Sequence, residues 1–214
     1  MSDAARPGPG EELNLDGPPV EPRQAATVIV LRGGGEHIEL LLVQRNPAQR
    51  FMGGAWVFPG GAVDTHEGDG DAAHRLAAVR EVEEEAGVRL PDPDALVKFS
   101  RWITPAMVKI RFDTHFFLAE MPADQEVTID GNECVDFRWT TPRDALEAHR
   151  HGRLLLVFPT IKHLEQLEPF PSATAVLDHT RGREVRPVEP KVLGAGEEAR
   201  VVLPGEPGYE DEQR

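Results

Sequence analysis

Three glutamates, Glu81, Glu84 and Glu85, have the types and spacing to hold a divalent metal ion. They fall in residues 71–86, a stretch rich in Ala, Glu, Arg and Leu that predicts a helix ending at Gly87. Residues three and four apart share one helix face, so these carboxylates repel one another unless a cation lies between them. Mg²⁺ and Mn²⁺ prefer oxygen ligands, and Mg²⁺ commonly bridges carboxylates to phosphate oxygens. The pattern therefore indicates metal-dependent phosphate chemistry.

Taken alone, a run of glutamates is more typical of a solvated helix face. The wider pattern favours a functional site, because Gly60-Gly61 follows an apolar run, Glu67 follows Gly61 after five residues, and the segment Arg80-Glu81-Val82-Glu83-Glu84-Glu85-Ala86-Gly87-Val88 has a fixed spacing. This pattern resembles the signature of the Nudix hydrolase superfamily, Gly-x5-Glu-x7-Arg-Glu-U-x-Glu-Glu-x-Gly-U, in which U is aliphatic. Its spacer between Glu67 and Arg80 is twelve residues instead of seven. The extra residues are expected in a Gly-rich loop, and the role of Glu67 is open to Asp64 or to no residue.

The resemblance implies a set of metal ligands, with Mg²⁺ or Mn²⁺ as cofactor. Glu81 and Glu85 are the strongest candidates, Glu84 is the next, and the Gly61 carbonyl is an additional ligand, since glycine lets the backbone approach closely. Arg80 and Glu84 form an i,i+4 pair, so Arg80 is expected to orient a carboxylate rather than to bind phosphate.

The general base that activates water is open between two positions. One is the metal helix, with Glu84 as its candidate. The other is Glu133, which follows Asp130-Gly131-Asn132 and precedes a predicted strand. For Glu133, a solvated turn residue is an equally good interpretation.

A narrower resemblance concerns the substrate. The branch of peroxisomal-type coenzyme A diphosphatases and their bacterial relatives is similar in segments 41–45, 50–61, 101–105 and 111–117. It implies hydrolysis of a phosphoanhydride in a nucleoside diphosphate linked to another moiety, with CoA or acyl-CoA favoured. ADP-ribose, dinucleotides and nucleotide sugars are alternatives, as is a non-catalytic nucleotide-binding module.

Cationic side chains that could receive the substrate phosphates are scattered outside the helix. Each could equally balance the surface of an acidic protein. The candidates are Arg45, Arg50, Arg101 and Arg111.

Composition bounds the class of protein. The 214 residues, 40% of them hydrophobic, suit one domain, predicted over residues 24–193 between a flexible leader (1–23) and an acidic flexible tail (194–214). The net charge of -14 argues against nucleic-acid binding, and no apolar segment is long enough to span a membrane. A single cysteine, Cys134, and the absence of a recognisable signal peptide predict a cytoplasmic location. A homodimer is possible, and nothing in the sequence decides it.

The pattern of elements predicts an α/β protein with a mixed sheet, and the resemblance implies the Nudix α/β/α sandwich. Two helices are predicted after the metal helix, from Thr141-Pro142 to Gly152 and from about Pro159 to Leu167. Strands are predicted at residues 25–31, 38–44, 55–58, 95–103, 113–120 and 135–139, the first two forming a hairpin.

Overall fold

The computed structural model describes residues 14, 17–34, 37–193 and 200–209. An eight-stranded mixed sheet forms its centre, with the order β3-β2-β1-β6-β5-β8, and with β4 paired to β1 and β7 paired to β2. The strands are β1 (Arg23–Arg32), β2 (Glu39–Arg45), β3 (Trp56–Val57), β4 (Gly60–Ala62), β5 (Val97–Ile103), β6 (Phe112–Glu120), β7 (Cys134–Thr140) and β8 (Pro187–Val188), and a separate pair is formed by β9 (Lys191–Leu193) and β10 (Arg200–Val202).

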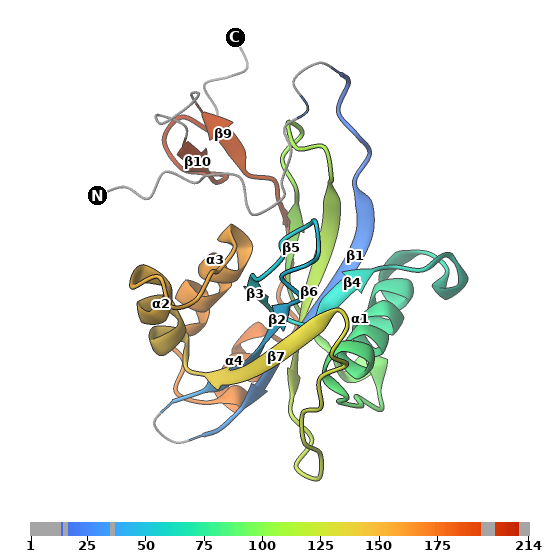
Figure 1. Ribbon diagram of the computed structural model, residues 1–214, viewed down its shortest axis with the longest axis vertical. Coiled ribbons are helices and arrows are strands. Elements are labelled where there is room, and N and C mark those ends of the chain that lie inside the picture. The colour runs from blue at the N-terminus through green and yellow to red at the C-terminus, as the bar shows by residue number, and fades with distance from the viewer. Residues whose placement is uncertain (1–13, 15–16, 35–36, 194–199, 210–214) are drawn as a thin grey trace.

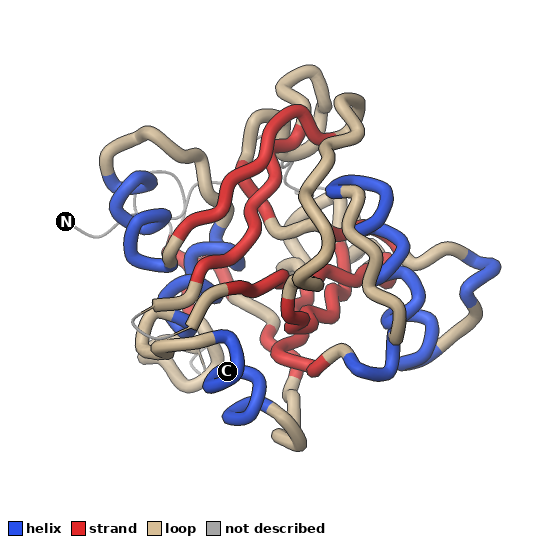
Figure 2. The backbone as a smooth tube through the Cα atoms, turned by 90° about the horizontal axis from the view of Figure 1, so that it is seen from below, coloured by secondary structure: helices blue, strands red, loops and turns tan. Residues whose placement is uncertain are grey.

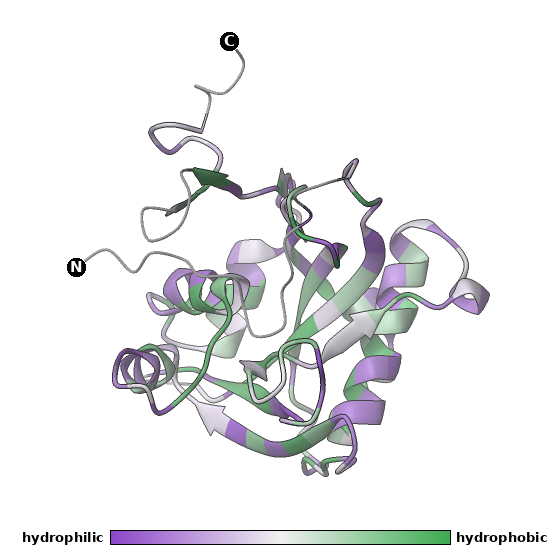
Figure 3. Cartoon of the chain, turned by 45° about the horizontal axis from the view of Figure 1, so that its top comes forward, coloured by the Kyte–Doolittle hydropathy of each residue, from purple (hydrophilic) through white to green (hydrophobic). Residues whose placement is uncertain are grey.

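Helices cover both faces of this sheet, which confirms the predicted α/β/α sandwich. One face carries α1 (Gly70–Ala86), and the other carries α2 (Pro142–Arg150), α3 (Phe158–Leu167) and α4 (Ala173–Thr180). Figure 1 shows α1 on one side of the strands and the three later helices on the other, and Figure 2 shows the same layers from below. Hydrophobic residues concentrate on the inner strands in Figure 3, while the helices show hydrophilic outer faces.

Strand β1 explains how the two cores are separated. Ile29 and Leu31 belong to the core under α2–α4, whereas Val28 and Val30 belong to the core under α1. A strand buried on both faces needs an unbroken apolar run, and β1 has one. Its parallel pairing with β6 and antiparallel pairing with β2 confirm a mixed sheet and the predicted hairpin.

The end of α1 fixes the last carboxylates of the helix in place. Gly87 has φ of 66°, and its amide donates to the Glu83 carbonyl at 3.0 Å. A Cβ at this position would lie 3.0 Å from the Thr128 carbonyl oxygen. Glycine is therefore required both by the left-handed backbone and by the neighbouring chain.

Several predicted bounds differ from the structure. The helix predicted over residues 71–86 is confirmed as α1 and begins one residue earlier, at Gly70, so Gly70 and Asp71 of the expected Gly-rich loop are helical. Gly60 and Gly61, which follow the predicted strand 55–58, begin a further strand, β4, and pair with Thr27 and Ala26 of β1. Helix α4 and strands β8 to β10 were not predicted, since they are short and their apolar residues give no clear period.

The chain ends also contain more structure than the prediction of a flexible leader and tail. Before β1, the Val20 carbonyl accepts a hydrogen bond from Arg111 at 2.8 Å. Strand β10 lies inside the predicted tail and pairs with β9, so the boundary predicted at residue 193 falls within a two-stranded sheet. Residues 1–13, 15–16, 194–199 and 210–214 of the predicted leader and tail lie outside the described residues. Within the described part of the chain, no helix has the length and apolar character needed to cross a bilayer.

Candidate active site

Glu85 is the most deeply buried carboxylate on α1. Its residue is 2% exposed, and its Oε2 accepts the Gly60 amide at 2.9 Å. Its Oε1 is buried, has no hydrogen-bond partner in the described structure, and lies 3.9 Å from Arg45 Nη1. Burial, reinforced by the nearby Glu81 charge, raises the pKa of Glu85 to about 7. A buried carboxylate oxygen without a donor is well suited to meet a cation.

Gly60 and Gly61 adjoin the carboxylates for different reasons. A Cβ on Gly61 would overlap the Glu81 carboxylate, so glycine gives this side chain room against the β4 backbone. A Cβ on Gly60 would instead overlap the backbone of Ala26 and Thr27 in β1. The missing Cβ of Gly61 therefore makes room for Glu81, and the missing Cβ of Gly60 makes room for strand β1. Glu81 itself is 9% exposed, and burial raises its pKa.

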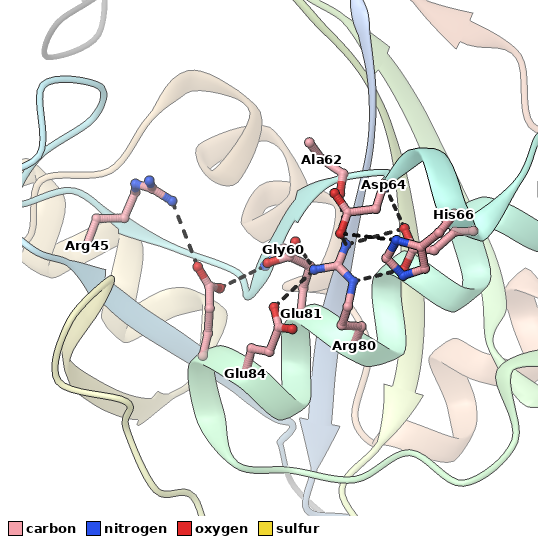
Figure 4. Close-up of polar contacts among 10 residues, drawn as sticks. Arg45, Gly60, Ala62, Asp64, His66, Arg80, Glu81 and Glu84 are labelled. Atoms are coloured by element: carbon pink, nitrogen blue, oxygen red, sulfur yellow. Dashed lines mark hydrogen bonds and ion pairs between the residues drawn. The ribbon is translucent and has the colours of Figure 1, made fainter.

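Arg80 connects the carboxylates of α1 to the loop before it. Its Nε donates to Glu67 Oε1 at 2.9 Å and its Nη2 to the Ala62 carbonyl at 3.0 Å. Its Nη1 donates to Glu81 Oε1 at 2.7 Å and to Glu84 Oε2 at 3.0 Å. Figure 4 shows Arg80 lying between the glutamates of the helix and the loop that carries Asp64. The predicted role of Arg80 in orienting Glu84 agrees with this contact.

The long spacer does not remove Glu67 from the site. Glu67 ends the short 3₁₀ helix Thr65–Glu67, its Oε2 accepts the Asp64 amide at 2.6 Å, and the spacer returns through α1 to Arg80. Burial alone would raise the Glu67 pKa, but the hydrogen bonds from Arg80 and from the Asp64 amide outweigh burial and lower it. Asp64 is the more distant partner, at 3.9 Å from Arg80 Nη2. The structure thus gives Glu67 the anchoring position, which the sequence left open.

The predicted carboxylate ligands fit a hard divalent cation, because Glu85 Oε1 lacks a hydrogen-bond donor and Gly61 leaves space beside Glu81. The Gly61 carbonyl does not fit: the Val28 amide donates to the Pro59 carbonyl and the Val63 amide to the Gln24 carbonyl, so in the alternating ladder the main chain of Gly61 faces Ala26 of β1. Gly60 faces the other way, and its amide donates to Glu85. The described residues contain no group of three or more His, Cys, Asp or Glu side chains already arranged around one point. Arg80 Nη1 is one reason why the carboxylates do not converge on one point, because it hydrogen-bonds both Glu81 and Glu84. A cation and Arg80 Nη1 would therefore compete for the same oxygens.

Glu133 lies near these carboxylates, on the turn before β7. Its amide donates to Asp130 Oδ2 at 2.8 Å, and its carbonyl accepts the Asn46 amide at 2.8 Å. Its exposed carboxylate is near enough for its charge to contribute to the raised pKa of Glu81. The fold therefore brings Glu133 next to the helix glutamates, although 48 residues separate Glu133 from Glu85 in the sequence.

The four arginines predicted to bind substrate have different surroundings. Arg45 reaches the cluster, where its Nη2 also donates to Gln49. Arg50 is exposed on the β2–β3 loop. Arg101 forms two hydrogen bonds to Asp113, at 2.8 and 2.6 Å. Arg111 is 8% exposed and holds Thr104, Val20 and Glu189 together at 2.8 to 2.9 Å. We interpret Arg101 and Arg111 as structural, because these interactions already occupy their guanidinium groups.

Cys134 was not predicted to be a neighbour of the carboxylate cluster. Cys134 is fully buried, and burial together with the nearby Glu85 charge raises the pKa of its thiol. The sequence predicted an ordinary strand residue here. Only its position one residue after Glu133 hinted at the site.

Comparisons with known proteins agree with this geometry. A family model described as NUDIX domain matches residues 21–158. The human protein named acyl-coenzyme A diphosphatase NUDT19 is 24% identical over 98% of this chain and 83% of its own length. Putative nudix hydrolase 7 of Caenorhabditis elegans is 28% identical over 68% of this chain and 60% of its own length. A crystal structure of a NUDIX hydrolase from Alicyclobacillus acidocaldarius covers 77% of this chain and 99% of its own, with a TM-score of 0.68 and 28% identity.

The chain therefore belongs to the Nudix family, and it is a hydrolase. The matched region contains the whole carboxylate cluster of α1, the Gly60-Gly61 strand and Glu133. Its substrates are nucleoside diphosphate derivatives, and enzymes of this family use divalent metal ions.

Proposed function

We propose that this protein hydrolyses the phosphoanhydride of a nucleoside diphosphate linked to another moiety, with Mg²⁺ or Mn²⁺, and that CoA or acyl-CoA is its substrate. The observation that carries the reaction type is the buried Glu85 Oε1, which has no hydrogen-bond donor and lies near the Glu81 charge, on a carboxylate whose other oxygen accepts the Gly60 amide. The CoA preference rests on the resemblance in sequence and on the name of the human relative. ADP-ribose, dinucleotides and nucleotide sugars are the alternatives within the same chemistry.

Each protein group has a defined task in this proposal. A divalent cation held by Glu81, Glu84 and Glu85 would neutralise the diphosphate charge and polarise its phosphorus–oxygen bonds. Arg80 keeps Glu81 and Glu84 in place, and Glu67 and the Ala62 carbonyl keep Arg80 in place.

Glu133 or Glu84 accepts a proton from the attacking water. The water oxygen bonds to phosphorus, the bridging phosphorus–oxygen bond breaks, and two phosphate monoesters leave. Both carboxylates are exposed enough to meet water, since the Glu84 side chain is 58% exposed and Glu133 lies on the surface.

Product separation after incubation of the purified full chain tests the proposal. CoA, acetyl-CoA, a longer acyl-CoA, ADP-ribose, NADH, diadenosine polyphosphates and nucleoside triphosphates are offered with Mg²⁺ and then Mn²⁺. We expect cleavage of CoA species that is lost in Glu85→Gln and kept in Glu83→Gln. The second variant is a matched control, because Glu83 is on the same helix but pairs with Arg89 at 2.7 Å.

Each outcome of this screen has a separate meaning. Cleavage of another diphosphate would keep the reaction and reject the CoA preference. Binding of a nucleotide without cleavage would favour a binding module. Glu133→Gln then separates the two candidate bases: a loss as large as that in Glu84→Gln would assign the base to Glu133, whereas a mild loss would return it to the helix.

A further inference from the structure

Strand β7 is an open edge of the sheet. Within the described residues it pairs with β2 alone, through the antiparallel register that joins Leu40 to Thr140 and Gln44 to Asp136. Figure 1 shows β7 at the front of the molecule with β2 behind it. An open edge offers main-chain donors and acceptors to another strand.

Hydrogen bonds of β2 identify which β7 residues face outward. The Arg45 amide donates to the Ala55 carbonyl, and the Arg45 carbonyl accepts the Gly54 amide, so Arg45 faces the β3 side of β2. Because main-chain groups alternate along a strand, Gln44 faces β7, and its opposite residue Asp136 faces β2. The main chain of Phe137 then points away from the sheet. Consistently, the Phe137 amide donates at 2.8 Å to the carboxylate of its neighbour Asp136.

The residues of this edge complement their own reversed order, because reversal about Phe137 exchanges the acidic and the basic position and leaves the apolar positions apolar. The order is Val135, Asp136, Phe137, Arg138 and Trp139, which is apolar, acidic, apolar, basic, apolar. Figure 3 shows the corresponding alternation of hydrophobic and hydrophilic residues along β7. If two copies pair antiparallel with Phe137 opposite Phe137, each Asp136 faces Arg138 of the partner subunit. Each Val135 then lies near Trp139 of the partner subunit.

Both kinds of side chain are available for such a contact. Val135 is 41% and Phe137 38% exposed, which is high for large apolar side chains. Asp136 and Arg138 are exposed, and within the described part of the chain neither forms an ion pair; Arg138 lies 5.4 Å from the Trp56 ring centroid. Charges on an edge strand normally oppose pairing, but here each charge meets its opposite.

We propose that β7 is a self-complementary docking strand, through which two copies of this chain form a symmetric antiparallel dimer centred on Phe137. Phe137 occupies a hydrogen-bonded pair, so Asp136 and Arg138 occupy the adjacent non-hydrogen-bonded pairs, where side chains are closest. The Phe137 amide then donates to the carbonyl of Phe137 of the partner subunit. The Asp136 carboxylate, no longer bonded to that amide, is free to pair with Arg138 of the partner subunit. The register shift next to Arg45 ends the regular ladder near Val135, so the interface is small and the dimer is weak.

This dimer would lie beside the candidate active site, because Cys134 begins β7 and Glu133 precedes it. The inference does not depend on the proposed substrate or reaction. The chain could dimerise through β7 without hydrolysing a diphosphate, and it could hydrolyse a diphosphate as a monomer, so the two proposals fail separately.

Exchange of the two charges provides a test that only this register predicts. Sedimentation velocity over a concentration series is measured for the full chain, Asp136→Arg, Arg138→Asp, their equimolar mixture and the double variant. We expect the native chain to dimerise at high concentration and each single variant to remain monomeric, since like charges then face each other twice. The mixture and the double variant should both recover the dimer, because opposite charges again face each other. Circular dichroism and turnover, expected to be unchanged, report that the exposed substitutions leave the fold intact.

A second measurement avoids dependence on charge. Phe137→Cys should form an intermolecular disulfide under mild oxidation, because opposed hydrogen-bonded residues have Cα atoms about 5.5 Å apart. Leu155→Cys, at a site 46% exposed elsewhere, is the matched control and should cross-link more slowly. A native chain that is monomeric at every concentration, a dimer unaffected by both single variants, a mixture that fails to dimerise, or equal cross-linking of the two cysteines would overturn the proposal.

Discussion

Replacing Glu85 by glutamine should stabilise the metal-free protein while abolishing its turnover. The carboxylate is 2% exposed, and burial raises its pKa from 4.5 to about 7. Glutamine has nearly the same shape and can still accept the Gly60 amide, but it has no charge to bury. The variant therefore separates the functional use of the carboxylate from its cost to folding.

The magnitude follows from linkage between protonation and folding. Between pH 4.5 and about 7 the folded chain keeps a proton at Glu85 that the unfolded chain has lost, so the contribution of this group to stability falls as pH rises. At roughly 1.36 kcal/mol for each pKa unit, the full rise corresponds to about 3 kcal/mol above pH 7. Glu85→Gln should be more stable than the native chain by up to about 3 kcal/mol near pH 8, and nearly equal to it below about pH 4.5.

Urea unfolding in the presence of a chelator, at several pH values, measures this difference. Glu84→Gln is the control, because a side chain that is 58% exposed has little burial to relieve. Added Mg²⁺ or Mn²⁺ should stabilise the native chain and have less effect on Glu85→Gln, since a ligand is lost. A variant that is less stable than the native chain at about pH 8, or a difference that does not change with pH, would refute the reasoning.

Two further predictions concern the glycine strand and the other core. Gly61→Ala should fold normally but lose most metal binding and activity, because the added Cβ displaces the flexible Glu81 carboxylate; Gly60→Ala should instead lower stability by about 1–3 kcal/mol, because its Cβ meets the β1 backbone. Metal titration and thermal unfolding of the pair check this, and identical behaviour of the two variants would contradict it. His163 is fully buried, and burial lowers its pKa from 6.5 to about 3, so its contribution to stability is complete above pH 6.5 and is lost as pH falls toward 3. The loss near pH 4.5 should be about 3 kcal/mol and absent in His163→Phe, as measured by urea unfolding; parallel pH profiles for the two proteins would argue against it.

The sequence alone determined the features that depend on local spacing. Glu81, Glu84 and Glu85 share a helix face because the helix repeats every 3.6 residues, and Gly87 ends that helix because it can adopt positive φ. The alternation and length of apolar runs likewise predicted the long strands and the mixed sheet. These properties need only the residue types and their order, so they could be predicted before the structure was known.

The tertiary structure decided which side chains meet and which are buried. Glu67 reaches Arg80 across a spacer of twelve residues, Glu133 approaches Glu81 from the turn before β7, and Cys134 approaches Glu85 from the start of β7. Arg45 and Arg111 were both predicted to bind substrate phosphates. In the structure Arg45 lies near the Glu85 carboxylate, whereas Arg111 is buried among Thr104, Val20 and Glu189. A pKa depends on burial and on neighbouring charges, and both come from contacts between segments far apart in the chain. The sequence therefore determined the candidate ligands, and the packing of the sheet against α1 determined their environment.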